Sequence, residues 1–498
     1  MTTFSYEFDT PVFNKRVSLP TGVFIDNEFS RGADQTTIDI VNPTTGKTVT
    51  SISEGTAADV DRAVVAARRA FSTTWGLNTP GVQRGQLLHK FADLIAANVE
   101  ELGAIIALEN GKTFTSAKLE PMWAPAFIRY YAGWADKNHG KTIETSEAKL
   151  AYTRHEPIGV CGQIIPWNYP LMNMIMKLGP ALATGCTVVV KPSELTPLTA
   201  LRVCQLIVEA GFPPGVVNVV VGYGHTVGQA ITEHMDIDKI AFTGSTLTGR
   251  KVQEASAKSN LKNVTLELGG KSPSIIFDDA DVEQAVKWTL LSMFSNQGQV
   301  CVASSRIFVQ AGIYDKFLEA YTQGVLEIKL GDPFAPDTVQ GPQVSKAQFD
   351  RIMGYIESGK AQGATAHIGG EQHGDAGYWI KPTIFTGTTP DMKIVREEIF
   401  GPVVALIKFE DEDDVVRQAN DTIYGLAASV FTQNLRRAIE TAHRLQAGQV
   451  YVNSANNADP NMPFGGYKQS GIGRELGEEA LVAYTNVKAV HVNLAHAI

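Results

Sequence analysis

The feature that most constrains the fold is a repeated alternation, beyond residue 155, of short apolar runs with helical stretches. Runs of this kind are typical of strands in a parallel sheet that is buried on both faces. The alternation predicts a doubly wound α/β sheet, whose ligands bind beyond the carboxyl ends of its strands. The runs that support this prediction are residues 159–165, 187–190 and 239–242.

The length and composition exclude several classes of protein. With 498 residues, of which 44% are hydrophobic and 19% charged, the chain is long enough for two or three packed domains. A net charge of -9 without a basic run leaves no electrostatic footprint for nucleic acid or anionic lipid. No apolar run approaches the roughly 18 residues of a membrane span. We therefore expect a small-molecule partner, and neither nucleic acid nor a membrane.

The cysteines and the N-terminus indicate the compartment. The four cysteines are widely spaced and form no C-x-x-C pair, so neither a zinc cluster nor a disulfide scaffold is predicted, and no metal is expected. The N-terminal segment contains Glu7 and Asp9, has no apolar signal core and is not rich in arginine. These features predict a cytoplasmic protein in a reducing compartment. The cysteines are Cys161, Cys186, Cys204 and Cys301.

Two segments interrupt the α/β rhythm. Residues 141–157 and 490–494 alternate polar and apolar side chains, as half-buried strands do. They can pair into a small separate sheet or form a hairpin within a domain, and the pattern favours neither.

Polar loops follow two of the predicted strands. After 187–190, Lys191 and Glu194 stand where a carboxylate can accept hydrogen bonds from adenosine ribose hydroxyls and repel a 2'-phosphate. A solvated ion pair is the commoner role of such a loop. After 239–242, Gly244 and Ser245 open a helical stretch whose N-terminus can hold a phosphate. A simple helix cap explains that turn equally well and is the commoner case.

Two further polar residues stand in unusual surroundings. Glu267 lies between leucines in a predicted strand, and burial would raise its pKa toward the range useful to a general base. It can also point outward to water. Asn168 is flanked by Pro166 and Pro170, which fix the backbone around an amide that can donate to an oxyanion. A turn asparagine is the alternative.

Cys301 differs from a cysteine used as a core hydrophobe. It lies in the stretch NQGQVCVASSR, among amides, hydroxyls, a glycine and small side chains. A reactive thiol needs room, hydrogen-bond donors and access, whereas a core cysteine sits among branched apolar neighbours.

These motifs resemble the NAD(P)-dependent aldehyde dehydrogenase superfamily, and the likeness covers essentially the whole chain. It is closest to the tetrameric cytosolic and mitochondrial enzymes that oxidise acetaldehyde. The motifs occur in the family's order: WNYP at 167, KPSE at 191, FTGST at 242, LELGGK at 266, NQGQVC at 296, EEIFGPV at 397 and PFGGYKQSG at 463.

The resemblance implies an α/β fold with a Rossmann-like cofactor domain, a second α/β catalytic domain and a small β oligomerisation element. The implied ranges are 1–138 and 159–269 for the dinucleotide-binding domain, 270–470 for the catalytic domain, and 139–158 with 484–498 for the oligomerisation element.

The resemblance also implies residue roles. Cys301 would be the nucleophile that forms a thiohemiacetal and then a thioester, which requires a lowered pKa or a nearby base. The Asn168 amide and the Cys301 backbone N–H would form the oxyanion hole, and Glu267 would activate the water that hydrolyses the thioester.

NAD is the implied cofactor, with NADP a weaker possibility. The implied cofactor residues are Lys191, Glu194, Gly244, Ser245, Glu398 and Phe400, with Gln348 and Trp167 carried over more weakly. The implied substrate pocket contains Trp123, Tyr169, Met176 and Phe464. Relatives often carry phenylalanine at 169 and tryptophan at 176, so either the pocket differs here or the two positions compensate within the core.

The implied activity is NAD-dependent oxidation of an aldehyde to a carboxylic acid by a homotetramer, a dimer of dimers. The alternatives are a CoA-acylating semialdehyde dehydrogenase and a structural protein that has lost catalysis. Glu267 favours transfer to water, because members that acylate CoA commonly lack this glutamate. Cys301, Asn168 and Glu267 together argue against lost catalysis.

Overall fold

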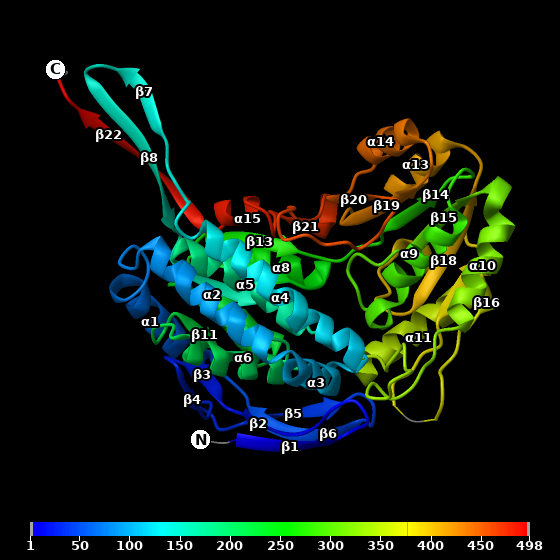
Figure 1. Ribbon diagram of the computed structural model, residues 1–498, viewed down its shortest axis with the longest axis horizontal. Coiled ribbons are helices and arrows are strands. Elements are labelled where there is room, and N and C mark those ends of the chain that lie inside the picture. The colour runs from blue at the N-terminus through cyan, green and yellow to red at the C-terminus, as the bar shows by residue number, and fades with distance from the viewer. Residues whose placement is uncertain (1–2, 376, 496–498) are drawn as a thin grey trace.

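The computed structural model describes residues 3–375 and 377–495. Parts of the expected ranges 1–138, 270–470 and 484–498 therefore lie outside the described residues, namely 1–2, 376 and 496–498. Figure 1 shows two α/β lobes side by side and a narrow sheet projecting from the first of them. The α/β class inferred from the apolar runs is confirmed.

The first lobe is built on a sheet of eight strands whose five central strands are parallel. The chain order of these five strands reverses between β9 and β12, which is where doubly wound sheets bind their ligands. In spatial order the strands are β21 (Gly471–Ile472), β13 (Asn263–Glu267), β12 (Lys239–Thr243), β9 (Val160–Ile164), β10 (Thr187–Lys191), β11 (Val217–Val219), β3 (Val23–Ile25) and β4 (Glu28–Ser30).

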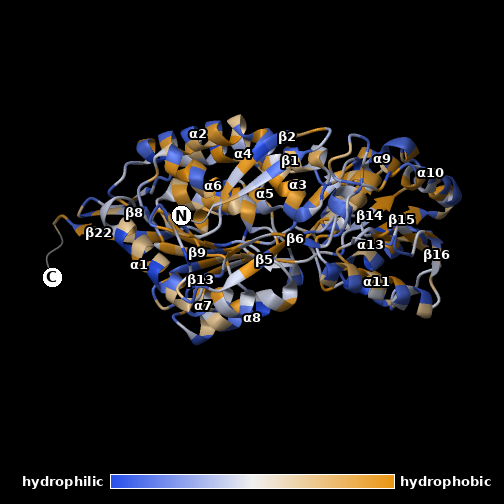
Figure 2. Ribbon diagram, turned by 90° about the horizontal axis from the view of Figure 1, so that it is seen from below, coloured by the Kyte–Doolittle hydropathy of each residue, from blue (hydrophilic) through white to orange (hydrophobic). Residues whose placement is uncertain are grey.

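Helices cover both faces of this sheet (Figure 2). Along β10, Val188 and Val190 join the core on one face while Val189 joins the core on the other, as the two-residue period of a strand requires. The helices of this lobe are α1 (Ala57–Thr73), α2 (Gly81–Ala97), α3 (Val99–Asn110), α4 (Phe114–Trp134), α5 (Pro170–Thr184), α6 (Pro197–Ala210), α7 (Gln229–Glu233) and α8 (Thr246–Lys258).

Proline and glycine set the ends of the two helices nearest the sheet's ligand edge. α5 and α6 each begin with proline, which has no N–H to leave unpaired in the first turn. Each ends at a glycine with positive φ, Gly185 at 99° and Gly211 at 94°. The start of α5 is thus held directly after Asn168.

The second lobe contains a sheet of seven strands, six of them parallel. In spatial order they are β16 (Thr365–Ile368), β17 (Thr383–Thr386), β18 (Val403–Phe409), β15 (Arg306–Gln310), β14 (Pro273–Ile276), β19 (Ala427–Phe431) and β20 (Gln449–Val452). The helices that follow β13 are α9 (Val282–Phe294), α10 (Tyr314–Leu326), α11 (Lys346–Ala361), α12 (Lys393–Arg396), α13 (Glu412–Asn420), α14 (Leu435–Arg444) and α15 (Glu479–Val482).

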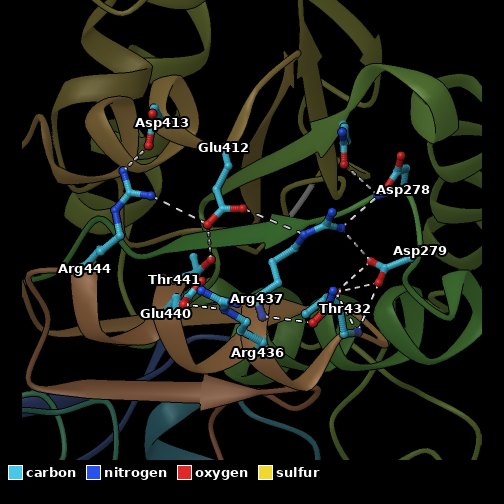
Figure 3. A network of polar contacts seen from close by, with 12 residues as sticks. Asp278, Asp279, Glu412, Asp413, Thr432, Arg436, Arg437, Glu440, Thr441 and Arg444 are labelled. Carbon is cyan, nitrogen blue, oxygen red and sulfur yellow. Dashed lines mark hydrogen bonds and ion pairs between the residues drawn. The ribbon is translucent and has the colours of Figure 1, made fainter.

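Ion pairs join α13 and α14 to the strand ends of the second sheet (Figure 3). The Arg437 guanidinium lies 3.2 Å from Asp279 and 3.8 Å from Glu412, and Arg444 lies 2.5 Å from Asp413. Because these side chains are partly exposed, each pair contributes about 0–1 kcal/mol to stability.

The segments that interrupt the α/β rhythm form a separate three-stranded sheet, so the first of the two expected arrangements is confirmed. Its strands are β22 (Thr485–Asn493), β8 (Lys149–Pro157) and β7 (Thr142–Ser146), all antiparallel. The last strand begins earlier than expected. The sheet is also more exposed than its alternation predicted, since most positions of β7 and β22 are exposed and those of β8 are mostly half-buried.

Two smaller antiparallel pairs lie near the N-terminus: β1 (Thr3–Asp9) with β2 (Asn14–Pro20), and β5 (Thr37–Asn42) with β6 (Lys47–Ser53). Within residues 3–375 and 377–495, the helices are too short or too polar to cross a membrane.

Candidate functional site

The candidate site lies at the carboxyl ends of the parallel strands in the first sheet. Asn168 follows β9, Glu194 follows β10, Gly244 and Ser245 follow β12, and Glu267 is the last residue of β13. Cys301 comes from the second lobe, between α9 and β15. Residues far apart in the sequence therefore meet because parallel strands all end at one edge.

The polar residues around Cys301 hold its loop in place. The backbone of Asn296, Gln297 and Gly298 is left-handed, with φ of 48°, 57° and 72°. The Gln297 amide donates to the carbonyls of Gly111 and Pro342, at 2.9 Å each. A strained loop needs such external partners, so the amides of this motif fasten the loop that presents the thiol.

The surroundings of Cys301 favour the neutral thiol over the thiolate. Burial, with the Glu267 and Glu398 carboxylates nearby, raises its pKa to about 12. Of the two routes to a reactive thiol considered from the sequence, a lowered pKa is wrong for this structure, and a nearby base remains. Cys301 is partly exposed, whereas Cys161, Cys186 and Cys204 are completely buried.

Glu267 is the first candidate for that base, because its charge raises the pKa of Cys301 more than that of Glu398 does. Its side chain is buried, so the alternative in which it points outward to water is wrong. Neither carboxylate oxygen has a hydrogen-bond partner within the part of the chain that the structure describes. A Cβ on Gly465 would lie 2.7 Å from its Oε1, so glycine leaves room for the carboxylate. Burial and Glu475 raise the pKa of Glu267, and Lys177 opposes that shift.

Lys177 and Glu475 are absent from the set of residues predicted from the sequence. Lys177 is completely buried on α5, pairs with Glu475 and donates to the Thr243 hydroxyl at 2.5 Å. The only sequence signal is a lone lysine in an otherwise apolar helix. Nothing local marks Glu475, which lies 298 positions away.

Asn168 is buried, and both its side-chain amide and its backbone carbonyl make hydrogen bonds. Its side-chain amide donates to the Gln299 carbonyl at 3.1 Å, two residues before Cys301. Its backbone carbonyl accepts hydrogen bonds from Lys112 Nζ at 2.8 Å and from the Asn296 amide at 2.9 Å. The second amide hydrogen of Asn168 is left for a ligand, since a side-chain amide carries two donors.

Lys191 and Glu194 form the ion pair expected from their loop, but it is not a fully solvated one. Lys191 is buried, with Nζ 3.2 Å from the Glu194 carboxylate and 3.0 Å from the Pro192 carbonyl. Burial lowers the pKa of Lys191, and Glu194 opposes that change. Glu194 remains partly exposed and available to a ligand.

The turn after β12 has the geometry of a helix cap and of a ligand cradle. The Ser245 hydroxyl accepts from the Thr248 N–H at 3.3 Å, so this residue does cap α8. A Cβ on Gly244 would lie 2.6 Å from the Phe242 ring, which leaves no room for a side chain. Ser245 is exposed, so the start of α8 lies at the surface.

The other candidate cofactor residues gather between the two lobes. The Glu398 carboxylate accepts from the Gly270 N–H at 3.0 Å, and burial raises its pKa to about 7. The Gln348 amide donates to the Phe400 carbonyl at 2.8 Å. The Phe400 ring lies 5.3 Å from the Trp167 ring, edge to face. A small cavity beside this group is lined by Gly270, Val300, Glu398 and Phe400 among others.

The candidate pocket residues are only partly brought together. Tyr169 and Phe464 pack in the same hydrophobic cluster as Cys301. Met176 packs together with Tyr169 and Phe464 against the core of the first lobe, whereas Trp123 on α4 is 53% exposed. Three of the four candidate pocket residues therefore share one cluster, and two of these three also share a cluster with Cys301.

Comparisons with known proteins identify the family to which this chain is similar. A model of the aldehyde dehydrogenase family matches residues 29–490. An aldehyde dehydrogenase of Agaricus bisporus is 65% identical over 99% of this chain and 98% of its own length. The NAD+ complex of an aldehyde dehydrogenase from Bacillus cereus is 47% identical, with a TM-score of 0.94 over 95% of this chain and 97% of that one. A betaine aldehyde dehydrogenase from Staphylococcus aureus in complex with NAD+ is 41% identical, with a TM-score of 0.94 over 96% of each chain.

Proposed function

Because this chain belongs to the aldehyde dehydrogenase family, we propose that it oxidises aldehydes to carboxylic acids with NAD, through a thioester on Cys301. The observation that carries the proposal is the convergence of three segments on one site. The charge of Glu267 raises the pKa of the Cys301 thiol. The Asn168 side-chain amide donates a hydrogen bond to the Gln299 carbonyl, two residues before the thiol.

The residues present fit a dinucleotide. Gly244 has no side chain, which allows close approach of a pyrophosphate. The amides at the start of α8 can hold that group. Glu194 and Lys191 would hold the adenosine ribose, and Glu398 with Phe400 would hold the nicotinamide ribose. When bound, NAD supplies the acceptor for the hydride removed from the aldehyde carbon. NAD complexes of two similar enzymes support this assignment.

In the first half of the reaction, Glu267 accepts the Cys301 proton, and the sulfur forms a bond to the aldehyde carbon. The carbonyl electron pair moves to oxygen, where the Asn168 amide and the Cys301 N–H stabilise the alkoxide. The base is essential because a thiol with a pKa of about 12 is almost wholly protonated at neutral pH.

In the second half, Cys301 carries the acyl group as a thioester. After Glu267 has released the Cys301 proton to solvent, it takes a proton from water as the water oxygen attacks the acyl carbon. The carbon–sulfur bond then breaks, and that proton passes to sulfur, which gives the acid and the thiol. Lys177 and Glu475 set the charge around Glu267, so they tune the proton affinity of the base. A steady-state screen of aliphatic, aromatic and amino aldehydes with both nicotinamide cofactors tests the whole proposal; no oxidation of any of them would refute it.

Glu194 is expected to make NAD the preferred cofactor. A 2'-phosphate would face its carboxylate, and each tenfold of preference in kcat/KM corresponds to about 1.4 kcal/mol. The buried Lys191 charge works in the opposite direction, so the preference is incomplete. Glu194→Gln should narrow the ratio of the two kcat/KM values, and Glu209→Gln, a carboxylate near the end of α6, should leave it unchanged. Equal kcat/KM for both cofactors in the parent would contradict the prediction.

The three-stranded sheet supports assembly into a homo-oligomer, which we propose is a dimer of dimers. It projects from the first lobe (Figure 1) and exposes Ile143, Leu150, Val487 and Val492. A sheet with unpaired edge strands and an exposed apolar face tends to associate with another chain. An assembly with closed symmetry pairs the edges and covers the apolar face.

Removing residues 487–498 should therefore weaken assembly, because it deletes most of β22. Removing only 494–498 keeps that strand and is the matched control. Light scattering at micromolar concentration should give a multiple of one chain's mass for the parent and the control, and a smaller mass for the longer truncation. One chain's mass for the parent would exclude an oligomer.

A further inference from the structure

Residues 109–112, which comprise the end of α3 and the start of the turn that leads to α4, reach several segments of the site. The Glu109 carboxylate accepts from the N–H groups of Leu198 and Thr199, at the start of α6. The Asn110 amide donates to the Trp167 carbonyl at 2.8 Å. The carbonyl of Gly111 accepts from the Gln297 amide, as described above. This segment thus connects the loop before α5 with the cysteine loop.

Within this segment, Lys112 is the residue that contacts Asn168, the candidate oxyanion donor. Its Nζ lies 2.6 Å from Glu120 Oε1 and 2.8 Å from the Asn168 carbonyl, and 4.1 Å from the centroid of the Tyr169 ring. Lys112 and Glu120 are each 1% exposed. All three donors of the ammonium can therefore be directed at the ion-pair partner, the Asn168 backbone and the following ring.

Glu120 holds the other side of the same segment. Its Oε2 accepts from the N–H groups of Leu171 and Met172, at 3.1 Å each. These are among the first amides of α5, which have no partner within the helix and favour a negative charge. The ion pair therefore makes hydrogen bonds to the backbone on both sides of Tyr169, at Asn168 before it and at Leu171 and Met172 after it.

A buried ion pair of this kind is poorly explained by stability alone. Removing two charges from water costs about as much as their attraction returns, and an apolar pair of similar volume is often as stable. What an apolar pair would lack is directed bonding to the Asn168 carbonyl and to the α5 amides. Resting on the proposed function, we infer that the Lys112–Glu120 pair is a positioning device, which holds the Asn168 side-chain amide where the alkoxide forms.

The test is a double-mutant cycle with Lys112→Met and Asn168→Ala. Losing an oxyanion donor costs about 10²–10³ in kcat, and misplacing it by about 1 Å costs up to about 10². Lys112→Met should thus lower kcat at least tenfold in the parent background, less than Asn168→Ala does, because Asn296 still holds the Asn168 carbonyl. In the Asn168→Ala background it should change kcat less than twofold. The KM for NAD should stay constant in both.

A second readout avoids the cofactor. A 4-nitrophenyl ester acylates a thiolate through a tetrahedral oxyanion without NAD, so release of 4-nitrophenolate should show the same non-additive pattern. Lys118→Met, which breaks the partly exposed pair between Lys118 on α4 and Glu100 on α3, is the matched control and should change neither rate.

Lys112→Met leaves Glu120 as an unpaired buried charge and can fail to fold. Lys112→Met/Glu120→Gln removes both charges, keeps an acceptor for the α5 amides and should reproduce the loss. Glu120→Asp keeps both charges, retracts the carboxylate by one methylene and should also lower kcat.

Full additivity in the Asn168→Ala background, or an unchanged kcat in folded variants, would overturn the inference and leave the proposed function intact. A parent that oxidises no aldehyde would instead refute the proposed function itself.

Discussion

Cys301→Ser is expected to abolish aldehyde oxidation while NAD still binds. In the proposed mechanism the thiol needs Glu267 to ionise, because burial and the nearby carboxylates raise its pKa to about 12. A serine hydroxyl is harder to ionise than any thiol and is a weak nucleophile without a dedicated histidine-type base. The cofactor residues lie on other segments and keep their contacts. Formation of NADH measures the loss, and titration calorimetry with NAD measures what is retained.

The other cysteines supply the control. Cys204 is completely buried among apolar residues on α6. Cys204→Ala removes a thiol, as Cys301→Ser does, but at a position outside the site. Its kcat should stay close to that of the parent. Substantial turnover in Cys301→Ser would remove this residue from the mechanism, and a parent without activity would favour a protein that has lost catalysis.

Glu267→Gln should stall the enzyme as a Cys301 thioester. Removing a general base typically lowers the rate of its step by about 10²–10⁴. If hydride transfer stays faster than hydrolysis, mixing the variant with NAD and aldehyde should give a burst approaching one NADH per competent site. Mass spectrometry of the quenched protein should then find the acyl group on Cys301. Glu254→Gln, an exposed carboxylate on α8 paired with Lys258, should turn over like the parent.

The pH dependence separates the two duties of Glu267. If this carboxylate also deprotonates the thiol, the burst itself will be slow in Glu267→Gln. The thiol is protonated below its raised pKa of about 12, so the thiolate fraction grows about tenfold for each pH unit below that value. Raising the pH should therefore accelerate the burst. A burst rate independent of pH would assign the thiol proton to another base.

The same variant discriminates hydrolysis from acyl transfer to CoA. Parent turnover should not require CoA, because a buried carboxylate stands beside the thiol to activate water. An absolute requirement for CoA would move this protein to the acylating class. Unchanged turnover in Glu267→Gln would place the base elsewhere, with Glu398 the next candidate because its pKa is raised to about 7.

The local elements of the first lobe could be predicted from the sequence because their determinants are local. The runs at 159–165, 187–190 and 239–242 became β9, β10 and β12, since a strand buried on both faces needs apolar residues at successive positions. Cys301, Asn168 and Glu267 were identifiable because each stands in a short segment of unusual composition. Their catalytic roles, like the domain ranges, came from the family resemblance and remain predictions.

The positions of partners distant in sequence could not be predicted in this way. Lys177 and Glu475 lie 298 positions apart, and only the packing of α5 against the C-terminal segment brings their charges together beneath Glu267. A lone lysine in an apolar helix signals that some partner exists, because burying an unpaired charge is costly, but it does not identify that partner. The pairing of Lys112 with Glu120 could not be predicted from the sequence for the same reason.

By itself, then, the sequence determined the parallel strands, the segments that carry the polar residues and the candidate nucleophile, all of which depend on neighbouring residues. Only the tertiary structure decided the proton affinities and the contacts of those residues. The pKa of Cys301 is raised because the fold excludes water and places two carboxylates nearby. Solvation and charge–charge interaction depend on distances through space, which chain spacing does not specify.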